Sequence, residues 1–283
     1  MITPAGRSGK ARVNRVKLCP MDWIYLSPHM DDAALSCGGL IWEQASSGTP
    51  ASGRLRVGIW TICAGDPPGG VYSPFAESLH ARWETGPQAA AARRQEDLDS
   101  CQRLGAIPRH FSIPDAIYRL SPLDGSPLYD SPESLFGEIS PLENGLVADL
   151  RHELARTVPP EAELVCPLGI GGHVDHRLVR LAGEGLERRV WYYADFPYVV
   201  WMGVAPDRAG DELTGDRDSP GSGSGRPVES VLFPISDAAL DAWVESVAAH
   251  ASQISSFWAG VEEMEAALRS YCRGVGGIRL WRR

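Results

Sequence analysis

Short apolar runs alternate with segments of helical periodicity along most of the chain. The apolar runs predict strands, and segments whose apolar residues recur every three or four positions predict helices. The expected strands are 22–27, 54–63, 109–113, 163–168 and 189–195, and the expected helices are 33–47, 86–105, 132–157 and 176–188. This alternation predicts an α/β fold with a Rossmann-like, mostly parallel sheet that is flanked by helices.

The last part of the chain predicts a C-terminal strand–helix extension of this sheet. We expect a strand at 228–234, a helix from Ser236 to about Trp258, a second helix to Cys272 and a terminal strand at 278–281. Residues 206–227 are rich in Gly, Ser and Pro, as flexible linkers are. They could separate two domains, but the remainder is too small to be independent. We therefore expect a single domain at 21–283 with a flexible loop at about 206–227, preceded by a mobile basic tail at 1–20.

Composition narrows the class of protein. The chain has 283 residues, 43% of them apolar, and a net charge of −9, which disfavours a nucleic-acid partner. It contains no apolar stretch long enough for a transmembrane segment. The six cysteines form no Cys-x-x-Cys pair, so we expect buried free thiols rather than disulfides. The basic tail lacks the apolar region of a secretory signal, and cytoplasmic localisation is the default. The sequence is equally compatible with a monomer and with a homo-oligomer.

Two groups of chemically active residues follow predicted strands. His29-Met30-Asp31-Asp32 comes directly after strand 22–27, and His173-Val174-Asp175-His176 comes shortly after strand 163–168. In open α/β sheets, ligands bind at the carboxyl ends of the strands. The two groups therefore predict one metal centre that is built from both.

Each group alone has an ordinary explanation. Aspartates after a strand often only cap a helix, and paired histidines are often structural. Together they favour a catalytic zinc site of two imidazoles and one carboxylate, with one divalent ion per chain. His29 and Asp32 are the candidates from the first group, and His173 and His176 are those from the second. Asp31 could take a proton from water, and protonated His173 could stabilise an oxyanion and protonate a leaving amine.

These motifs resemble those of the PIG-L/LmbE-like family of zinc-dependent de-N-acetylases, the N-acetylglucosaminyl deacetylase type. The family typically has Pro-His-Pro-Asp-Asp-Glu, where this chain has Pro28-His29-Met30-Asp31-Asp32-Ala33. It typically has His-Pro-Asp-His, where this chain has His173-Val174-Asp175-His176. Arg93-Arg94-Gln95-Glu96, followed by Leu104-Gly105, is similar to the Arg-x-x-Glu helix of the family. The resemblance covers about 22–200.

The resemblance implies a role for each residue. His29, Asp32 and His176 would be the zinc ligands, Asp31 the general base, and His173 the residue that polarises the amide carbonyl and assists departure of the amine. Arg93 would contact the substrate, and a solvated charge on the helix is an equal alternative. Met30 and Ala33 depart from the family pattern at positions that do not bind metal, so they bear on substrate preference rather than on catalysis.

The implied function is zinc-dependent removal of an N-acetyl group from a small-molecule N-acetylglucosamine-type sugar conjugate. Two alternatives remain at this stage. One is a metal-dependent amidohydrolase that acts on a non-sugar N-acyl substrate. The other is a non-catalytic Rossmann-like binding module in which the aspartates only cap a helix. A cluster of aromatic residues from Trp191 to Trp201 could form a sugar platform, although core packing is the commoner use of such residues.

Overall fold

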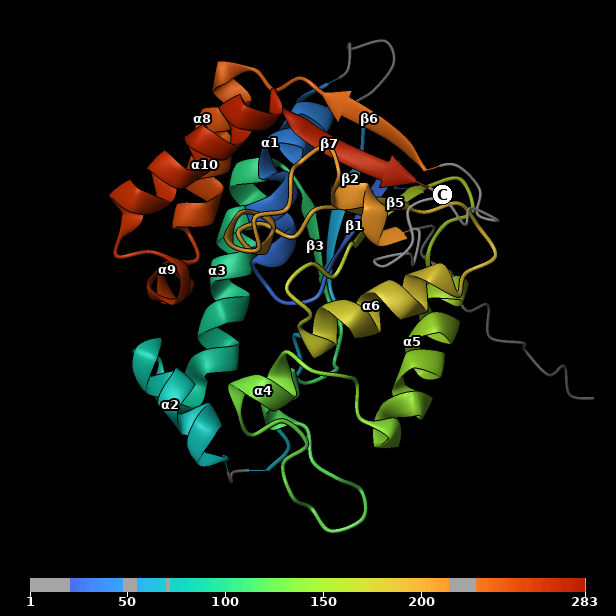
Figure 1. The fold of residues 1–283 in the computed structure, drawn as a ribbon, viewed down its shortest axis with the longest axis vertical. Coiled ribbons are helices and arrows are strands. Elements are labelled where there is room, and N and C mark those ends of the chain that lie inside the picture. Colours follow the sequence, from blue (N-terminus) through green and yellow to red (C-terminus); the bar gives the residue numbers. More distant parts are fainter. Residues whose placement is uncertain (1–20, 48–54, 70–71, 214–227, 283) are drawn as a thin grey trace, which may run out of the picture.

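A seven-stranded, mostly parallel sheet forms the centre of the molecule (Figure 1). The computed structural model describes residues 21–47, 55–69, 72–213 and 228–282. The strand order is β3-β2-β1-β4-β5-β7-β6. The strands are β1 (Trp23–Ser27), β2 (Val57–Thr61), β3 (Ile107–His110), β4 (Glu163–Pro167), β5 (Trp191–Tyr193), β6 (Glu229–Phe233) and β7 (Ile278–Arg282). The predicted α/β class and its C-terminal extension are confirmed.

The first five strands are parallel. Strand β7 pairs antiparallel with β5, and β6 pairs antiparallel with β7, so β6 runs in the direction of the first five. The residues of β1, β2 and β4 are almost all buried, which explains why these strands read as continuous apolar runs. From β1 the chain builds outward to β2 and β3, and β4 then returns to pair with the other side of β1. The gap between β1 and β4 is thus the switch point of the sheet, where such folds bind ligands.

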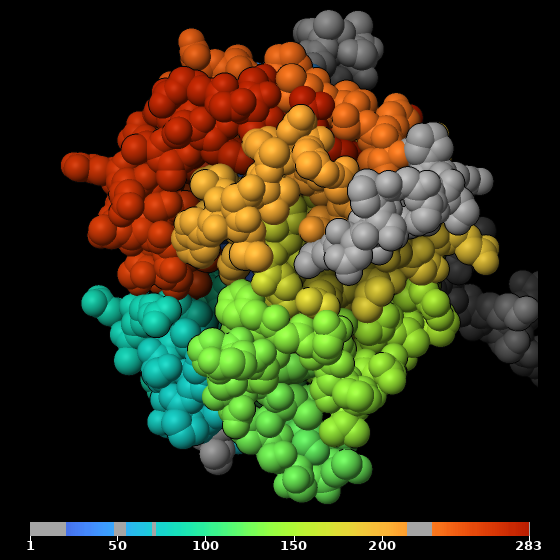
Figure 2. Space-filling view, in the orientation of Figure 1, coloured from blue at the N-terminus to red at the C-terminus, as the bar shows by residue number. Residues whose placement is uncertain are grey.

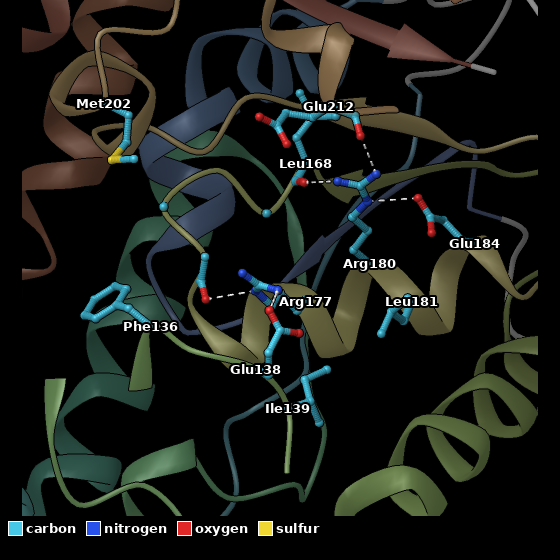
Figure 3. Close-up of a pocket in the computed structure, with 13 residues that line it drawn as sticks. Phe136, Glu138, Ile139, Leu168, Arg177, Arg180, Leu181, Glu184, Met202 and Glu212 are labelled. Atoms are coloured by element: carbon cyan, nitrogen blue, oxygen red, sulfur yellow. Dashed lines mark hydrogen bonds and ion pairs between the residues drawn. The ribbon is translucent and has the colours of Figure 1, made fainter. Parts of the chain in front are cut away.

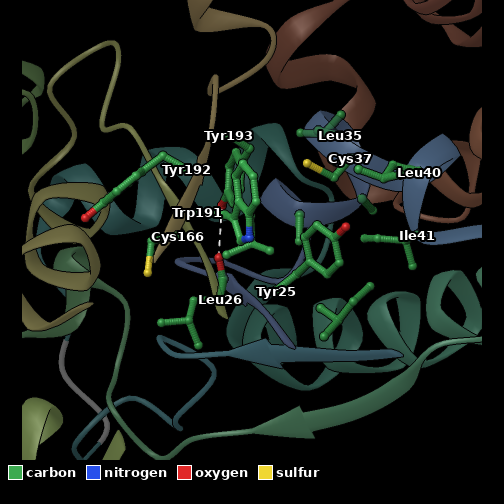
Figure 4. Close-up of a cluster of buried hydrophobic side chains, with 14 of the residues drawn as sticks. Tyr25, Leu26, Leu35, Cys37, Leu40, Ile41, Cys166, Trp191, Tyr192 and Tyr193 are labelled. Atoms are coloured by element: carbon green, nitrogen blue, oxygen red, sulfur yellow. Dashed lines mark hydrogen bonds between the residues drawn. The ribbon is translucent and has the colours of Figure 1, made fainter. Parts of the chain in front are cut away.

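Helices cover both faces of the sheet (Figure 1). One layer contains α1 (Asp32–Ser46), α3 (Ala89–Leu104), α8 (Asp237–Ala248) and α10 (Val261–Val275), and the other contains α5 (Asn144–Thr157) and α6 (Val174–Glu184). Residues of β1, β5 and α1 share one buried cluster, in which the Tyr193 hydroxyl donates to the Leu26 carbonyl at 3.0 Å (Figure 4). The five described cysteines are buried free thiols, as expected; Cys19 lies outside the described residues.

The structure corrects several predicted boundaries. The helix expected at 132–157 is wrong: α4 (Pro132–Leu135) ends before Gly137, and α5 begins only after a 3-10 turn at Pro141–Glu143. The helix expected from Ser236 to Trp258 divides at His250 into α8 and α9 (Ala251–Phe257). Strand β3 begins and ends earlier than the expected 109–113.

Two short helices lie in segments where none was expected. The predicted loop 64–85 contains α2 (Pro74–Arg82), which Ser73 caps through its side chain. Four residues after β5 the chain forms α7 (Tyr198–Trp201). The basic tail and residues 214–227 of the expected loop lie outside the described residues, as do 48–54, 70–71 and 283. In the described part of the chain, every helix is too short or too polar to cross a membrane.

Candidate metal centre

The two predicted motifs meet at the switch point of the sheet. The first follows β1, and its last residue, Asp32, opens α1. The second begins at His173, which caps α6 after the loop that follows β4. The Ser27 hydroxyl donates to the His29 carbonyl at 2.5 Å and accepts from the Ala33 N–H at 2.9 Å, so it holds the first turn rigidly. The topology of a parallel sheet thus brings together residues about 145 positions apart in sequence.

The structure brings together the three residues predicted to bind zinc. Asp32 lies between the two histidines: its Oδ2 is 3.2 Å from His29 Nδ1, and its Oδ1 is 3.3 Å from His176 Nε2. The imidazole centroids of His29 and His176 are 5.5 Å apart. All three side chains are buried.

A carboxylate fixes the orientation of each histidine. His29 Nε2 lies 3.0 Å from Asp175 Oδ2, and His176 Nδ1 lies 2.7 Å from Asp195 Oδ1. An imidazole that donates to a carboxylate through one nitrogen presents a lone pair at the other. The two free nitrogens, His29 Nδ1 and His176 Nε2, are the ones nearest to Asp32. His176 Nε2 is buried and has no hydrogen-bond partner among the described residues. This donor set fits a divalent cation such as zinc.

The electrostatics of the cluster also favour a cation. Burial alone would lower the pKa of His176, but Asp32 and Asp195 outweigh it and raise that pKa to about 10. Burial would also lower the pKa of His29, but Asp115, Asp175 and Asp32 outweigh this effect and raise that pKa well above its usual value. Burial would raise the pKa of Asp32, but the two histidines hold it well below its usual range. A divalent cation would take the place of the protons that these carboxylates stabilise on the imidazoles.

Two sets of side chains each bring three ligand atoms within 4.8 Å of one another, and neither set contains Asp32. They are His29 with His173 and His176, and His29 with Asp115 and Asp175. Asp175 is already occupied, because its carboxylate accepts from Arg119 Nη1 at 2.5 Å and from the Ala116 N–H at 3.0 Å besides contacting His29. His173 Nδ1 accepts from the Asp175 N–H at 3.1 Å. These bonds favour orienting and donor roles for Asp175 and His173.

His173 lies edge-on to His29, with ring centroids 4.6 Å apart. Because Nδ1 accepts a backbone N–H, the neutral ring carries its proton on Nε2 and can donate from there. Burial, and then the nearby His29, lower the pKa of His173 well below its usual value. The sequence predicts a protonated imidazole at position 173, whereas the structure favours a neutral ring that donates a hydrogen bond.

Asp31 occupies the N-cap position of α1, but its side chain makes no capping hydrogen bond. The carboxylate is buried and points to a pocket of about 290 Å³, whose lining includes His29, Asp32 and His173. Its Oδ1 lies 3.5 Å from Arg93 Nη2. The interpretation of Asp31 as a simple helix cap is therefore wrong.

Arg93 lies on α3 and reaches into the same pocket. Its Nη1 donates to Asp115 Oδ2 at 3.2 Å, and its guanidinium lies 4.9 Å from the ring centroid of Trp83. The side chain is buried, so the alternative of a solvated helix charge is wrong. Arg93 Nε has no hydrogen-bond partner within the described part of the chain.

The walls of the pocket come from segments that are far apart in sequence. They are helices α2, α7 and α9, the end of α4, and His173, which caps α6. These segments meet on the face shown in Figure 2. A larger groove of about 650 Å³ lies beside it and shares Phe136 (Figure 3). There Arg177 pairs with Glu138 and Arg180 with Glu184. None of the residues predicted to take part in catalysis lines this groove.

Several residues that fix the positions of the site side chains had no role assigned from the sequence. Arg119 donates to Asp175 and to Glu143, and Asp115 accepts from Arg93. Asp195 follows β5, so it is an acid at a strand end like Asp31 and Asp32, and that signal could have found it. Arg119 and Asp115 lie in the irregular stretch 114–131, where no periodicity points to a partner.

Comparisons with known proteins agree with the motifs. No family model matches the chain. A 2′-N-acetylparomamine deacetylase of Niallia circulans is 29% identical over 197 residues, which cover 62% of this chain and 67% of the relative. One of Streptomyces fradiae is 30% identical over 179 residues, which cover 62% of this chain and 57% of the relative. Both relatives are named as deacetylases of an N-acetylated amino sugar, in line with the family that the motifs resemble.

A solved structure of similar fold covers nearly the whole chain. The zinc-inhibited form of teicoplanin deacetylase Orf2 matches with a TM-score of 0.71 and 23% identity, covering 93% of this chain and 97% of that one. The sheet and its helical layers are thus similar in fold to those of that deacetylase. The chain spans less than two thirds of the Streptomyces relative.

Proposed function

We propose that this protein is a zinc-dependent N-deacetylase that hydrolyses the acetamide of an N-acetylglucosamine-type sugar conjugate. One observation carries the proposal: two carboxylate-oriented imidazoles turn their free nitrogens toward Asp32, directly beside the uncapped carboxylate of Asp31. A non-catalytic module would not need a buried carboxylate that points to the pocket without capping the helix.

His29, Asp32 and His176 would hold the zinc ion. When bound, zinc would lower the pKa of a water molecule and polarise a carbonyl oxygen. The two orienting carboxylates support this assignment, because histidines that bind metal usually donate their other N–H to such a partner.

Asp31 would accept the proton of the attacking water, whose oxygen forms a bond to the acyl carbon. His173 Nε2–H would donate a hydrogen bond to the developing oxyanion, and the C–N bond would then break as the amine takes up the proton that Asp31 accepted. The buried position of both side chains strengthens these interactions, since the surrounding protein excludes solvent.

A sugar substrate is supported by the pocket and by the relatives. Arg93 and Asp115 place charged hydrogen-bonding groups next to Asp31, where sugar hydroxyls could bind, while Trp83 and Phe136 offer ring faces. The curated relatives are named for an N-acetylated amino sugar. A volume of about 290 Å³ lies at the lower end of small-molecule sites.

The test is acetate release from a panel of N-acetylamino sugars and of non-sugar N-acetyl compounds. We expect turnover of sugars and a fall in kcat of about 10²–10⁴-fold in Asp31→Asn, which keeps the shape but removes the base. Zinc content and melting temperature serve as controls for folding and metal loading. Near-normal turnover in a folded, zinc-loaded Asp31→Asn would refute the base, and activity confined to non-sugars would refute the substrate class.

A further inference from the structure

A series of buried charged side chains leads from His29 away from the pocket. Asp175 contacts His29 through Oδ2, and its Oδ1 accepts from Arg119 Nη1. Arg119 in turn donates to Glu143 at two points, from Nε to Oε1 at 2.5 Å and from Nη2 to Oε2 at 3.3 Å. Arg119 and Glu143 have exposed fractions of only 6% and 5%, and neither lines the pocket or the groove beside it. Any effect of this pair on the site must therefore pass through Asp175.

The surrounding residues hold the pair in one geometry. The Tyr129 hydroxyl donates to Glu143 Oε2 at 2.6 Å and accepts from the Ser140 N–H at 2.8 Å. The ring of Tyr129 is buried, and its centroid lies 5.3 Å from the Arg119 guanidinium. Burying an ion pair costs about as much as it returns, so stability alone does not explain this arrangement.

The charges of the series explain why Arg119 needs Glu143. A guanidinium bound to Asp175 fixes the direction of that carboxylate, but its positive charge would oppose a cation bound by His29. The Glu143 carboxylate compensates that charge. Together the three side chains keep the negative charge of a single carboxylate, and Asp175 can present it to His29.

We propose that Arg119 and Glu143 act as a pair of positioning residues for the metal centre. The guanidinium fixes Asp175 against His29, together with the Ala116 N–H that donates to Asp175 Oδ2 at 3.0 Å, and Glu143 cancels the charge of the guanidinium. The inference rests on the proposed function, because His29 is one of the residues that would hold zinc. The pair contacts neither zinc nor substrate, and its effect is on zinc affinity.

The test is zinc affinity, measured by competition with a chromogenic chelator. Arg119→Met/Glu143→Gln removes both charges and should weaken zinc binding about tenfold, because Asp175 loses a bond that fixes it. Glu143→Gln alone leaves the guanidinium charge uncompensated and should bind zinc about tenfold more weakly than the double variant. The matched control is Arg109→Met/Glu153→Gln, at a partly exposed pair 3.4 Å apart and outside the pocket lining, which should leave zinc affinity unchanged.

The order of the two affinities separates positioning from packing, since a purely structural role would make the double variant at least as weak as the single one. Melting temperatures show which variants fold. If Glu143→Gln does not fold, the double variant decides alone, because it leaves no unpaired guanidinium.

Zinc affinity in the double variant equal to that of the unmodified protein would overturn the inference. A double variant that binds zinc no more tightly than folded Glu143→Gln would also overturn it. Both results would leave the proposed function standing, whereas an unmodified protein that binds no zinc would overturn the proposed function and this inference together.

Discussion

At the scale of single residues, Asp195 and Asp175 are the key supports of the proposed metal centre. Each accepts from the nitrogen of a histidine that faces away from Asp32. A third Asp–His contact, between Asp97 and the partly exposed His110, is also 2.7 Å long but lies away from the pocket. Asp97 therefore provides a matched control for Asp195.

Asp195→Asn should weaken zinc binding by about 10- to 100-fold, because the carboxamide no longer fixes the tautomer of His176 or raises its basicity. Competition with a chromogenic chelator measures the affinity. Asp97→Asn should lower the melting temperature without changing zinc affinity. Equal zinc affinity in Asp195→Asn and the unmodified protein would contradict the role given to Asp195.

The sequence could locate His29, Asp32 and His176 because each lies in a short motif directly after or near the end of an apolar strand. It could not pair His29 with Asp175, or Asp175 with Arg119, because those contacts depend on how loops pack over the strand ends. It also could not decide whether Arg93 faces solvent, since that depends on how α9 packs against α3 and on the Trp83 ring that lies over the guanidinium.

At the scale of elements, α1 packs extensively against α8. The indole Nε1 of Trp243 donates to the Ala34 carbonyl at 2.7 Å, and its ring lies directly against Gly38. A Cβ at position 38 would lie 2.4 Å from Trp243 Cδ1. Glycine at this position therefore allows the C-terminal extension to pack onto the first helix.

Gly38→Ala should destabilise the protein by about 1–3 kcal/mol, because the fully buried Trp243 has no room to move. Gly145→Ala, in α5, meets no atom within 4 Å and should stabilise by about 0.4–1 kcal/mol. Urea unfolding of both variants measures the difference. Stabilisation by Gly38→Ala would contradict the packing described for Trp243.

Element boundaries were harder to predict than element types. Apolar spacing continues through 132–157, but Gly137 and Pro141 separate two helices there. Helix α2 was missed because Gly and Pro dominate the preceding residues, while its own start depends on the local cap by Ser73. In both cases a few polar or turn-forming residues set the helix boundary, against the apolar spacing or loop composition of the surrounding segment.

At the scale of the whole molecule, the C-terminal extension completes the sheet. Strand β7 pairs with β5 on one side and β6 on the other. The Glu96 carboxylate accepts from the N–H of Ser252 at 2.8 Å, which ties α9 to α3 and positions one wall of the pocket. The expectation of a single domain at 21–283 stays a prediction that these contacts support.

If that expectation is right, the whole chain unfolds in one cooperative transition, and a chain truncated after residue 227 shows none, because it loses β6, β7 and Trp243 together. Calorimetry and urea unfolding followed by two probes measure this. Two separate transitions in the whole chain, or a cooperative transition in the truncated one, would indicate two domains.

The most direct test is the position of zinc in a crystal of the purified protein, located by anomalous scattering at the zinc edge. The account predicts one peak about 2.0–2.2 Å from His29 Nδ1, His176 Nε2 and an Asp32 oxygen, with Asp31 outside the coordination sphere. A peak held instead by His29, Asp115 and Asp175, or no zinc at this end of the sheet, would contradict it.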